Sequence, residues 1–306
     1  MIEPLKVTRQ KFPKSTVTVQ GMKVLKLKPD NYELYYHSDV KYVERPERDL
    51  YLQIIEPIGG ERLPMVVFVP GSAFYKQDVK GRVAQLSMLA MRGYVVALLE
   101  YRGSEDAAFP GFVLDAKAGV LYMKEHAERY HGDPNKMFVM GDSSGGYTAL
   151  MTGLTLGVDS LEDEISRGKD YSVKGVIDFY GPTDFTTMNE EPSIQDHRVP
   201  ESPEGCAIGK NHVIERRDLS EPTIIKNYVA DGRKLPPVIM FHGSNDELVP
   251  FGQSCQLYEA LVANGHEASL YQMEGAHHGE REFWSSAMLD MLEEFMKQAM
   301  NKASND

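Results

Sequence analysis

The sequence has few cysteines, no long apolar run and fewer basic than acidic residues. Its two cysteines, Cys206 and Cys255, cannot form a disulfide framework, and a reducing compartment fits. It lacks a run of about 18 apolar residues, which a membrane helix needs, and the N-terminus lacks the apolar core of a signal peptide. The net charge of −12 argues against a nucleic-acid partner, because binding of phosphates requires a basic face. We therefore expect a cytoplasmic protein with no membrane or nucleic-acid partner.

The composition is that of a globular protein, with 42% hydrophobic and 25% charged residues. A chain of 306 residues can hold one large α/β domain or two small domains. Residues 1–16 are polar, and we expect them to form a flexible N-terminal arm. Residues 16–27 alternate between apolar and polar side chains, which predicts a first strand. We expect residues 17–306 to form a single domain.

Short apolar segments then alternate with helical patterns. Strands are predicted over 50–55, 65–69, 94–99, 136–140, 175–179, 238–241 and 268–272. Helices are predicted over 81–91, 112–131, 145–156, 253–264 and around 284–295. Apolar strands separated by helices form a mostly parallel sheet that is covered on both faces. The fold class is therefore predicted as α/β, a mostly parallel central sheet flanked by helices.

Residues 182–222 interrupt this alternation. Five prolines and many acidic and polar residues occur there without periodicity. A long connection within a compact domain is usually functional or mobile. We predict a short lid-like insertion beside the active site, with a second small domain as the alternative.

The pentapeptide at 141–145, Gly-Asp-Ser-Ser-Gly, lies between a predicted strand and a predicted helix. A serine on such a turn is held in a strained conformation, and the glycines on either side let neighbouring backbone approach. Its hydroxyl then projects at a helix N-terminus, which favours negative charge. This context predicts Ser143 as a nucleophile, although the pentapeptide alone could be an ordinary turn.

A serine nucleophile needs a base, and the base needs a carboxylate. Asp246 follows the predicted strand 238–241, and His278 follows the predicted strand 268–272. The order serine, acid, histidine differs from that of the chymotrypsin and subtilisin types. We predict that His278 takes the proton of Ser143 and that Asp246 orients His278.

Neighbouring residues leave alternatives for these roles. His277 could be the base in place of His278, and the two histidines could ligate zinc, although the sequence shows no further ligands at helical spacing. Glu247 is expected at the surface, and His242 is expected to support its loop through hydrogen bonds. We predict that no metal or organic cofactor is needed.

The developing oxyanion needs backbone N–H donors. Ser144, which follows the nucleophile, is predicted to supply one. The loop over 68–74 is predicted to supply the other, because the small residues at 71–73 allow close approach. A plain tight turn is the alternative for that loop. Residues predicted to contact the substrate are Phe74, Tyr180 and Val249.

With these motifs, the chain resembles the α/β-hydrolase superfamily from about residue 47 to residue 297. The resemblance is to bacterial esterases related to acetyl-xylan and feruloyl esterases and to the hormone-sensitive-lipase-like group. The superfamily pattern Gly-Ala-Gly-His-Gly, here Gly-Ala-His-His-Gly at 275–279, places the base on His278. The resemblance also implies that Arg102, Asp115 and Asp184 hold loops near the site. Related esterases carry His-Gly-Gly-Gly where this chain has Pro-Gly-Ser-Ala at 70–73, so we expect Pro70 to brace that loop. The resemblance implies, by position, that the N–H groups of Ser72 and Ala73 are the donors from this loop.

The resemblance implies a serine carboxylic ester hydrolase that forms an acyl-enzyme. Its expected substrates are short acyl esters, acetyl or hydroxycinnamoyl, of sugars or small alcohols. One alternative is an amide hydrolase of the same fold, such as an arylformamidase or a peptidase-like enzyme. Another is a non-catalytic binding protein, which would be expected to lose a triad member. The sequence leaves homo-oligomerisation open.

Overall fold

The computed structural model describes residues 3–28, 30–230 and 232–302, in two compact units, Met1–Asp30 and Asn31–Asp306. The described residues of the first unit are all exposed, and their one regular element is the 3₁₀ helix η1 (Arg9–Lys11). The strand predicted over 16–27 is therefore wrong. A strand needs a partner strand for its backbone hydrogen bonds, and within the described residues this segment pairs with none. The second unit begins at Asn31, and the domain boundary predicted at residue 17 stays a prediction.

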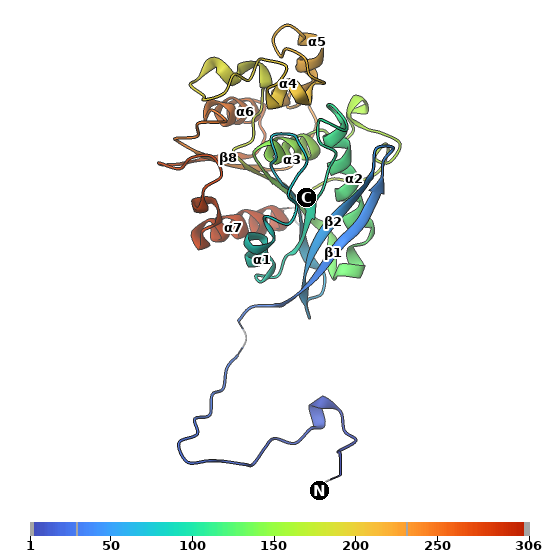
Figure 1. Cartoon of the computed structure of the whole chain (residues 1–306), viewed down its shortest axis with the longest axis vertical. Helices are drawn as coiled ribbons and strands as arrows, with labels where there is room; N and C mark the ends of the chain where they lie inside the picture. The colour runs from blue at the N-terminus through green and yellow to red at the C-terminus, as the bar shows by residue number, and fades with distance from the viewer. Residues whose placement is uncertain (1–2, 29, 231, 303–306) are drawn as a thin grey trace. The chain divides into compact units, whose positions relative to one another are not determined.

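An eight-stranded sheet in the order β1-β2-β4-β3-β5-β6-β7-β8 forms the centre of the second unit (Figure 1). Strand β2 pairs antiparallel with β1 and β4, and the other neighbours pair in parallel. The predicted α/β class is confirmed. The strands are β1 (Glu33–Glu44), β2 (Asp49–Ile58), β3 (Leu63–Val69), β4 (Val95–Leu99), β5 (Gly132–Asp142), β6 (Gly175–Phe179), β7 (Val238–Gly243) and β8 (Ala268–Met273).

Helices cover both faces of this sheet. One face packs against α1 (Val83–Ala90) and α7 (Ser286–Lys302), which lie together in Figure 1. The other face packs against α2 (Gly111–Glu125), α3 (Ser144–Leu154) and α6 (Gly252–Ala263). The predicted helix over 112–131 ends early, because α2 stops at Glu125 and a 3₁₀ turn, η2 (Ala127–Tyr130), follows.

Successive side chains of the central strands point to opposite faces of the sheet, and apolar side chains on both faces explain why both are buried. In β3, Met65 and Val67 belong to the core on the α2 and α3 face, while Val66 and Phe68 belong to the core on the α1 and α7 face. A strand that is apolar on both faces is typical of a parallel sheet between two helical layers. The carboxyl ends of β3, β5, β7 and β8 therefore open at one edge of the sheet, where ligands of such folds bind.

The insertion at 182–222 is made of short helical pieces: η4 (Phe185–Glu190), α4 (Pro203–Ala207), α5 (Arg217–Ser220) and the start of η5 (Glu221–Thr223). Several of its side chains are buried, including Phe185 and His197. The Ala207 carbonyl accepts from the Phe109 N–H at 2.7 Å, just before α2. The insertion is thus packed onto the helical layer around α2.

Candidate active site

Ser143 lies on the turn between β5 and α3, as the pentapeptide predicts. Its backbone is at φ 54° and ψ −128°, a left-handed φ that is strained for a serine. Its N–H donates to the Phe179 carbonyl at 2.8 Å, and its carbonyl accepts from the Tyr147 N–H at 3.1 Å. The turn is therefore fixed by β6 on one side and by the first turn of α3 on the other.

The glycines of the pentapeptide are required by close backbone contacts. A Cβ on Gly141 would lie 2.1 Å from the Gly145 carbonyl oxygen, and a Cβ on Gly145 would lie 2.0 Å from the Val69 carbonyl oxygen. Any side chain at either position would push apart the backbone of the turn and the end of β3.

Ser143, His278 and Asp246 lie in one hydrogen-bonded series. His278 Nε2 is 2.9 Å from Ser143 Oγ, and His278 Nδ1 is 2.7 Å from Asp246 Oδ2. An ionised carboxylate can only accept, so Nδ1 carries the proton and Nε2 accepts from the serine hydroxyl. The structure therefore brings together the three residues predicted for proton transfer.

Asp246 is buried, yet its surroundings favour the ionised form. Burial alone would raise its pKa, but hydrogen bonds from His242 and His278 outweigh burial and hold the pKa of Asp246 well below its ordinary value. Its Oδ1 accepts from the backbone N–H groups of Leu248 at 3.0 Å and Val249 at 2.8 Å. A permanently charged Asp246 stabilises an imidazolium at His278.

The neighbouring histidines and Glu247 lie where the sequence analysis expects them. His277 is exposed, and its Nδ1 is 3.0 Å from Glu247 Oε2, which is also exposed. His242 is buried between Ser254 Oγ and the Val249 carbonyl, each at 2.8 Å. Within residues 3–28, 30–230 and 232–302, no group of three or more acidic, His or Cys side chains is arranged to hold a metal ion.

One of the backbone N–H donors predicted in the loop after β3 is already engaged in a hydrogen bond. The Ser72 N–H donates to Ser144 Oγ at 2.9 Å, so the Ser144 side chain occupies this donor. In the part of the chain that the structure describes, the N–H groups of Ala73 and Ser144 form no hydrogen bond. Ala73 has a φ of 53°, a strained conformation for alanine. Ala73 and Ser144 are thus the two predicted donors that stay available for an oxyanion.

Side chains other than that of Pro70 brace this loop. The Asp142 carboxylate accepts from the Gly71 N–H at 2.6 Å and from Arg82 at 3.1 Å. Burial raises the pKa of Tyr101 to about 12, so its hydroxyl keeps its proton and donates to the Pro70 carbonyl at 2.9 Å. Sequence reasoning missed Asp142 and Tyr101 as braces, although Asp142 lies inside the pentapeptide itself.

The residues predicted to contact substrate lie in the packing behind the site. Phe74, Tyr180 and Val249 are only 1%, 1% and 6% exposed. Phe74 packs among Phe112, Tyr147 and Phe185. The ring of Tyr180 lies edge-on against the His278 ring, with centroids 4.7 Å apart. These side chains offer almost no surface to a ligand, and their contact with substrate stays a prediction.

Three residues expected to hold loops form buried contacts. Arg102 Nε donates to Asp115 Oδ2 at 3.0 Å, and Asp115 is fully buried. Asp184 Oδ1 accepts from the Thr186 N–H at 3.0 Å and so caps η4. These contacts fit the structural roles that the resemblance implies.

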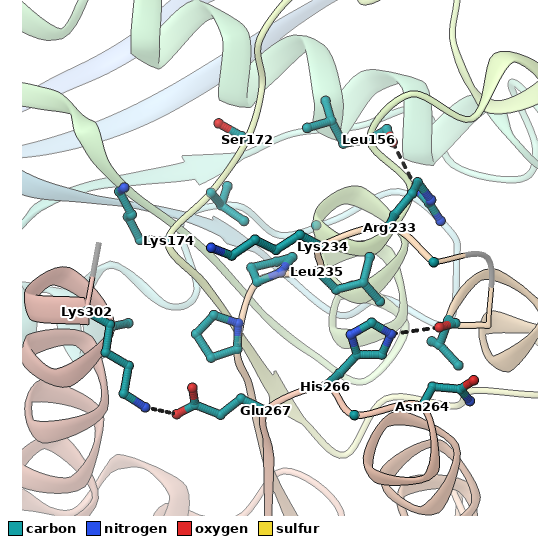
Figure 2. A pocket seen from close by; sticks show the side chains of 18 of the residues that line it. Leu156, Ser172, Lys174, Arg233, Lys234, Leu235, Asn264, His266, Glu267 and Lys302 are labelled. Carbon is teal, nitrogen blue, oxygen red and sulfur yellow. Dashed lines mark hydrogen bonds and ion pairs between the residues drawn. The ribbon is translucent and has the colours of Figure 1, made fainter. Parts of the chain in front are cut away.

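A cleft of about 1060 Å³ lies at the opposite edge of the sheet (Figure 2). It is lined by residues that precede strands β6, β7 and β8, namely Lys174, Pro237 and Glu267. Glu267 there pairs with Lys302 at 2.6 Å, as Figure 2 shows. No residue predicted for the active site lines this cleft.

In the described part of the chain, no helix combines the length and hydropathy that crossing a bilayer requires.

Comparison with known proteins identifies the family. The BD-FAE family model matches residues 49–261, more than half of the chain. The chain belongs to the BD-FAE family. The BD-FAE match includes Ser143 and Asp246, whereas His278 follows its end.

Curated relatives of this BD-FAE chain are named as esterases. Esterase LipC of Mycobacterium tuberculosis is 28% identical over 222 residues, which are 71% of this chain and 53% of LipC. Isoprenylcysteine alpha-carbonyl methylesterase ICME of Arabidopsis thaliana is 30% identical over 265 residues, which are 81% of this chain and 58% of ICME. The chain spans about half the length of the curated relatives it matches.

Solved structures confirm the fold. A truncated carbohydrate esterase from gut microbiota superposes with a TM-score of 0.76 at 23% identity, covering 90% of this chain and 99% of that one. Esterase Est2 of Thermogutta terrifontis, with propionate bound, gives a TM-score of 0.68 at 23% identity, covering 88% of this chain and 94% of that one. The predicted α/β-hydrolase fold is confirmed.

Proposed function

We propose that this protein is a serine hydrolase that cleaves carboxylic esters through an acyl-enzyme. The observation that carries the proposal is the hydrogen-bonded series from Ser143 through His278 to Asp246, which begins on a strained strand-to-helix turn. The names of the curated relatives, an esterase and a methylesterase among them, support the same reaction class.

In the first half of the proposed reaction, Ser143 Oγ attacks the ester carbonyl and its proton passes to His278 Nε2. Asp246 stays ionised, as its low pKa favours, and stabilises the imidazolium through Nδ1. We assign the oxyanion to the N–H groups of Ala73 and Ser144, because Ser144 Oγ occupies the Ser72 N–H. The Ser72 N–H then serves to hold the loop.

In the second half, His278 gives its proton to the leaving alcohol, which departs and leaves an acyl group on Ser143. Water enters, His278 Nε2 takes one of its protons, and the resulting hydroxide attacks the acyl carbonyl. The second tetrahedral intermediate collapses to release the acid, and Ser143 recovers its proton from His278. The cycle needs only the side chains and backbone donors already named.

For the substrate we propose short acyl esters, acetyl or hydroxycinnamoyl, of sugars or small alcohols. The support is the resemblance to acetyl-xylan and feruloyl esterases, together with the fold likeness to a gut-microbiota carbohydrate esterase. At 23% identity, the gut-microbiota structure supports the fold alone. The acyl group and the alcohol therefore need a direct test.

A panel of substrates tests both the reaction and the acyl group. It contains p-nitrophenyl esters of increasing chain length, acetylated and feruloylated oligosaccharides, and N-formylkynurenine as an amide. We expect hydrolysis of the short esters and of at least one oligosaccharide ester, unchanged after treatment with EDTA because the proposed cycle uses no metal. Preferred turnover of N-formylkynurenine would favour the amide hydrolase instead. Activity that EDTA abolishes and zinc restores would contradict the metal-free cycle.

A further inference from the structure

The insertion carries a second hydrogen-bonded series, formed by Ser193, His197 and Glu204. His197 Nδ1 is 2.8 Å from Glu204 Oε2, and His197 Nε2 is 3.0 Å from Ser193 Oγ. His197 and Glu204 are only 1% and 3% exposed, while Ser193 is half-buried. Nothing in the proposed ester chemistry uses these three side chains.

This series reaches the loop that carries Asp246. Ser193 Oγ is 3.1 Å from the carbonyl oxygens of both Glu247 and Leu248, and the Ile194 N–H donates to the Glu247 carbonyl at 3.0 Å. Glu247 and Leu248 directly follow Asp246, and the Leu248 N–H donates to Asp246 Oδ1. The insertion is therefore fastened to the turn that holds the acid of the triad.

A count of protons shows that the contacts of Ser193 depend on the state of His197. A hydroxyl donates one hydrogen bond and accepts two. When His197 is doubly protonated, Nδ1–H donates to Glu204 and Nε2–H donates to Ser193 Oγ. The oxygen also accepts from the Gln195 N–H at 3.2 Å, so its own proton is free for the carbonyls of Glu247 and Leu248.

When His197 is neutral, the same groups compete for one proton. Its remaining proton stays on Nδ1 because the Glu204 carboxylate can only accept. Nε2 then needs the hydroxyl proton of Ser193, which leaves both acid-loop carbonyls without that donor. The observed arrangement is fully satisfied only with His197 protonated.

We propose that Ser193, His197 and Glu204 form a proton-dependent latch, which fastens the insertion to the Asp246 loop when His197 is protonated and loosens it when His197 is neutral. The latch itself stands apart from the reaction. Its effect on catalysis rests on the proposed function, because it acts through the orientation of Asp246. These residues are positioning residues, since none of them touches Ser143 or His278 within the described structure.

Charged groups around His197 favour its protonated form. Burial lowers its pKa, but the Glu204 carboxylate outweighs burial, and together with the Leu248 backbone carbonyl and Asp196 it raises the pKa of His197 above the ordinary value. Asp196 also pairs with Arg198 at the surface, and the Glu247 side chain on the facing loop is engaged by His277. The latch is therefore complete below the ordinary histidine pKa of about 6.5 and is lost as pH rises through the higher folded value.

Hydrogen exchange of individual amides tests the latch without requiring activity. The Ile194 N–H reports the contact with Glu247, and the Val249 N–H reports the hold on Asp246. Between about pH 5 and about pH 9, after correction for intrinsic exchange, we expect protection of both amides in the wild type to fall roughly 2- to 10-fold. Ser193→Ala should show the lower protection at every pH. Equal pH dependence in both proteins, or none in the wild type, would overturn the latch.

Two further variants show whether titration of His197, or of another group, causes the pH-dependent change in amide protection. Glu204→Gln removes the carboxylate that stabilises the imidazolium, so the transition should move to lower pH. His212→Gln removes a histidine from the same insertion whose Nδ1 accepts only a long contact, 3.4 Å, from the Glu215 N–H. His212 also interacts electrostatically with Asp196, so this variant should keep the transition and move its midpoint far less than Glu204→Gln does. A transition that is lost in His212→Gln and unmoved in Glu204→Gln would place the titrating group elsewhere.

Kinetics then connect the latch to catalysis. On an accepted ester, the kcat of the wild type should exceed that of Ser193→Ala by roughly 2- to 10-fold on the acid side of the transition, the size of one net hydrogen bond. The ratio should approach one on the alkaline side, with KM little changed. A ratio that does not vary with pH would show a merely structural role. Absence of esterase activity with an intact exchange transition would reject the proposed function and leave the latch standing.

Discussion

Replacing Ser143 with alanine is expected to abolish ester turnover, with a loss on the order of 10⁴-fold or more in kcat. The change removes the only atom that attacks the carbonyl and leaves His278 and Asp246 without a proton to move. The fold should survive, because alanine replaces a hydroxyl that makes one side-chain hydrogen bond, to His278. Initial rates with a short p-nitrophenyl ester, alongside circular dichroism and thermal unfolding, measure both parts of the expectation.

Ser144→Ala is the matched control at the adjacent position. It keeps the backbone N–H assigned to the oxyanion and loses the hydroxyl that accepts from the Ser72 N–H. We expect a fall of about tenfold, because one loop hydrogen bond is lost. A dead Ser144→Ala beside an active Ser143→Ala would move the nucleophile by one residue.

His278→Ala is expected to reduce activity to the level of Ser143→Ala, because the serine and its base act as one proton-transfer unit. For the same reason, the double variant should be almost as active as either single variant. Additive losses on the order of 10⁸-fold in the double variant would show that the two residues act separately. All three proteins should be compared on one short-chain ester at one pH.

His277→Ala is the matched control for this second prediction. His277 is exposed and pairs with Glu247, whereas the ring that contacts Ser143 Oγ is that of His278. Substantial activity should remain in this variant, with losses arising only from the geometry of the loop. An inactive His277→Ala together with an active His278→Ala would transfer the base by one residue.

The sheet could be predicted where its strands are apolar on both faces. The prediction over 175–179 coincides with β6, and those over 65–69 and 238–241 fall within β3 and β7. β1 escaped prediction because it is an edge strand, largely exposed and interrupted by register shifts, so its sequence shows no clear apolar pattern. The segment 16–27 shows the opposite error: its alternating pattern predicts a strand, but the described structure supplies no partner strand for it.

The positions of the candidate triad could be predicted because each residue follows a recognisable strand, and parallel strands end at one edge of the sheet. The contacts that support the triad could not be predicted from the sequence, because they depend on side-chain packing between distant segments. Phe74 directly follows residues 70–73 of the loop after β3, yet it turns into an aromatic cluster through a φ of 64°. The series of His197 and Glu204 lies in a segment without periodicity, so no sequence pattern pointed to the hydrogen bond between them.

The central claim is that Ser143 forms a covalent intermediate, and labelling tests it most directly. The protein is treated with a serine-reactive organophosphonate, and mass spectrometry of the intact protein and its peptides locates the adduct. We expect a single adduct on Ser143, loss of esterase activity in proportion to labelling, and no adduct on the Ser143→Ala variant. An adduct on Ser144 or Ser193, or full loss of activity with Ser143 unlabelled, would contradict the account.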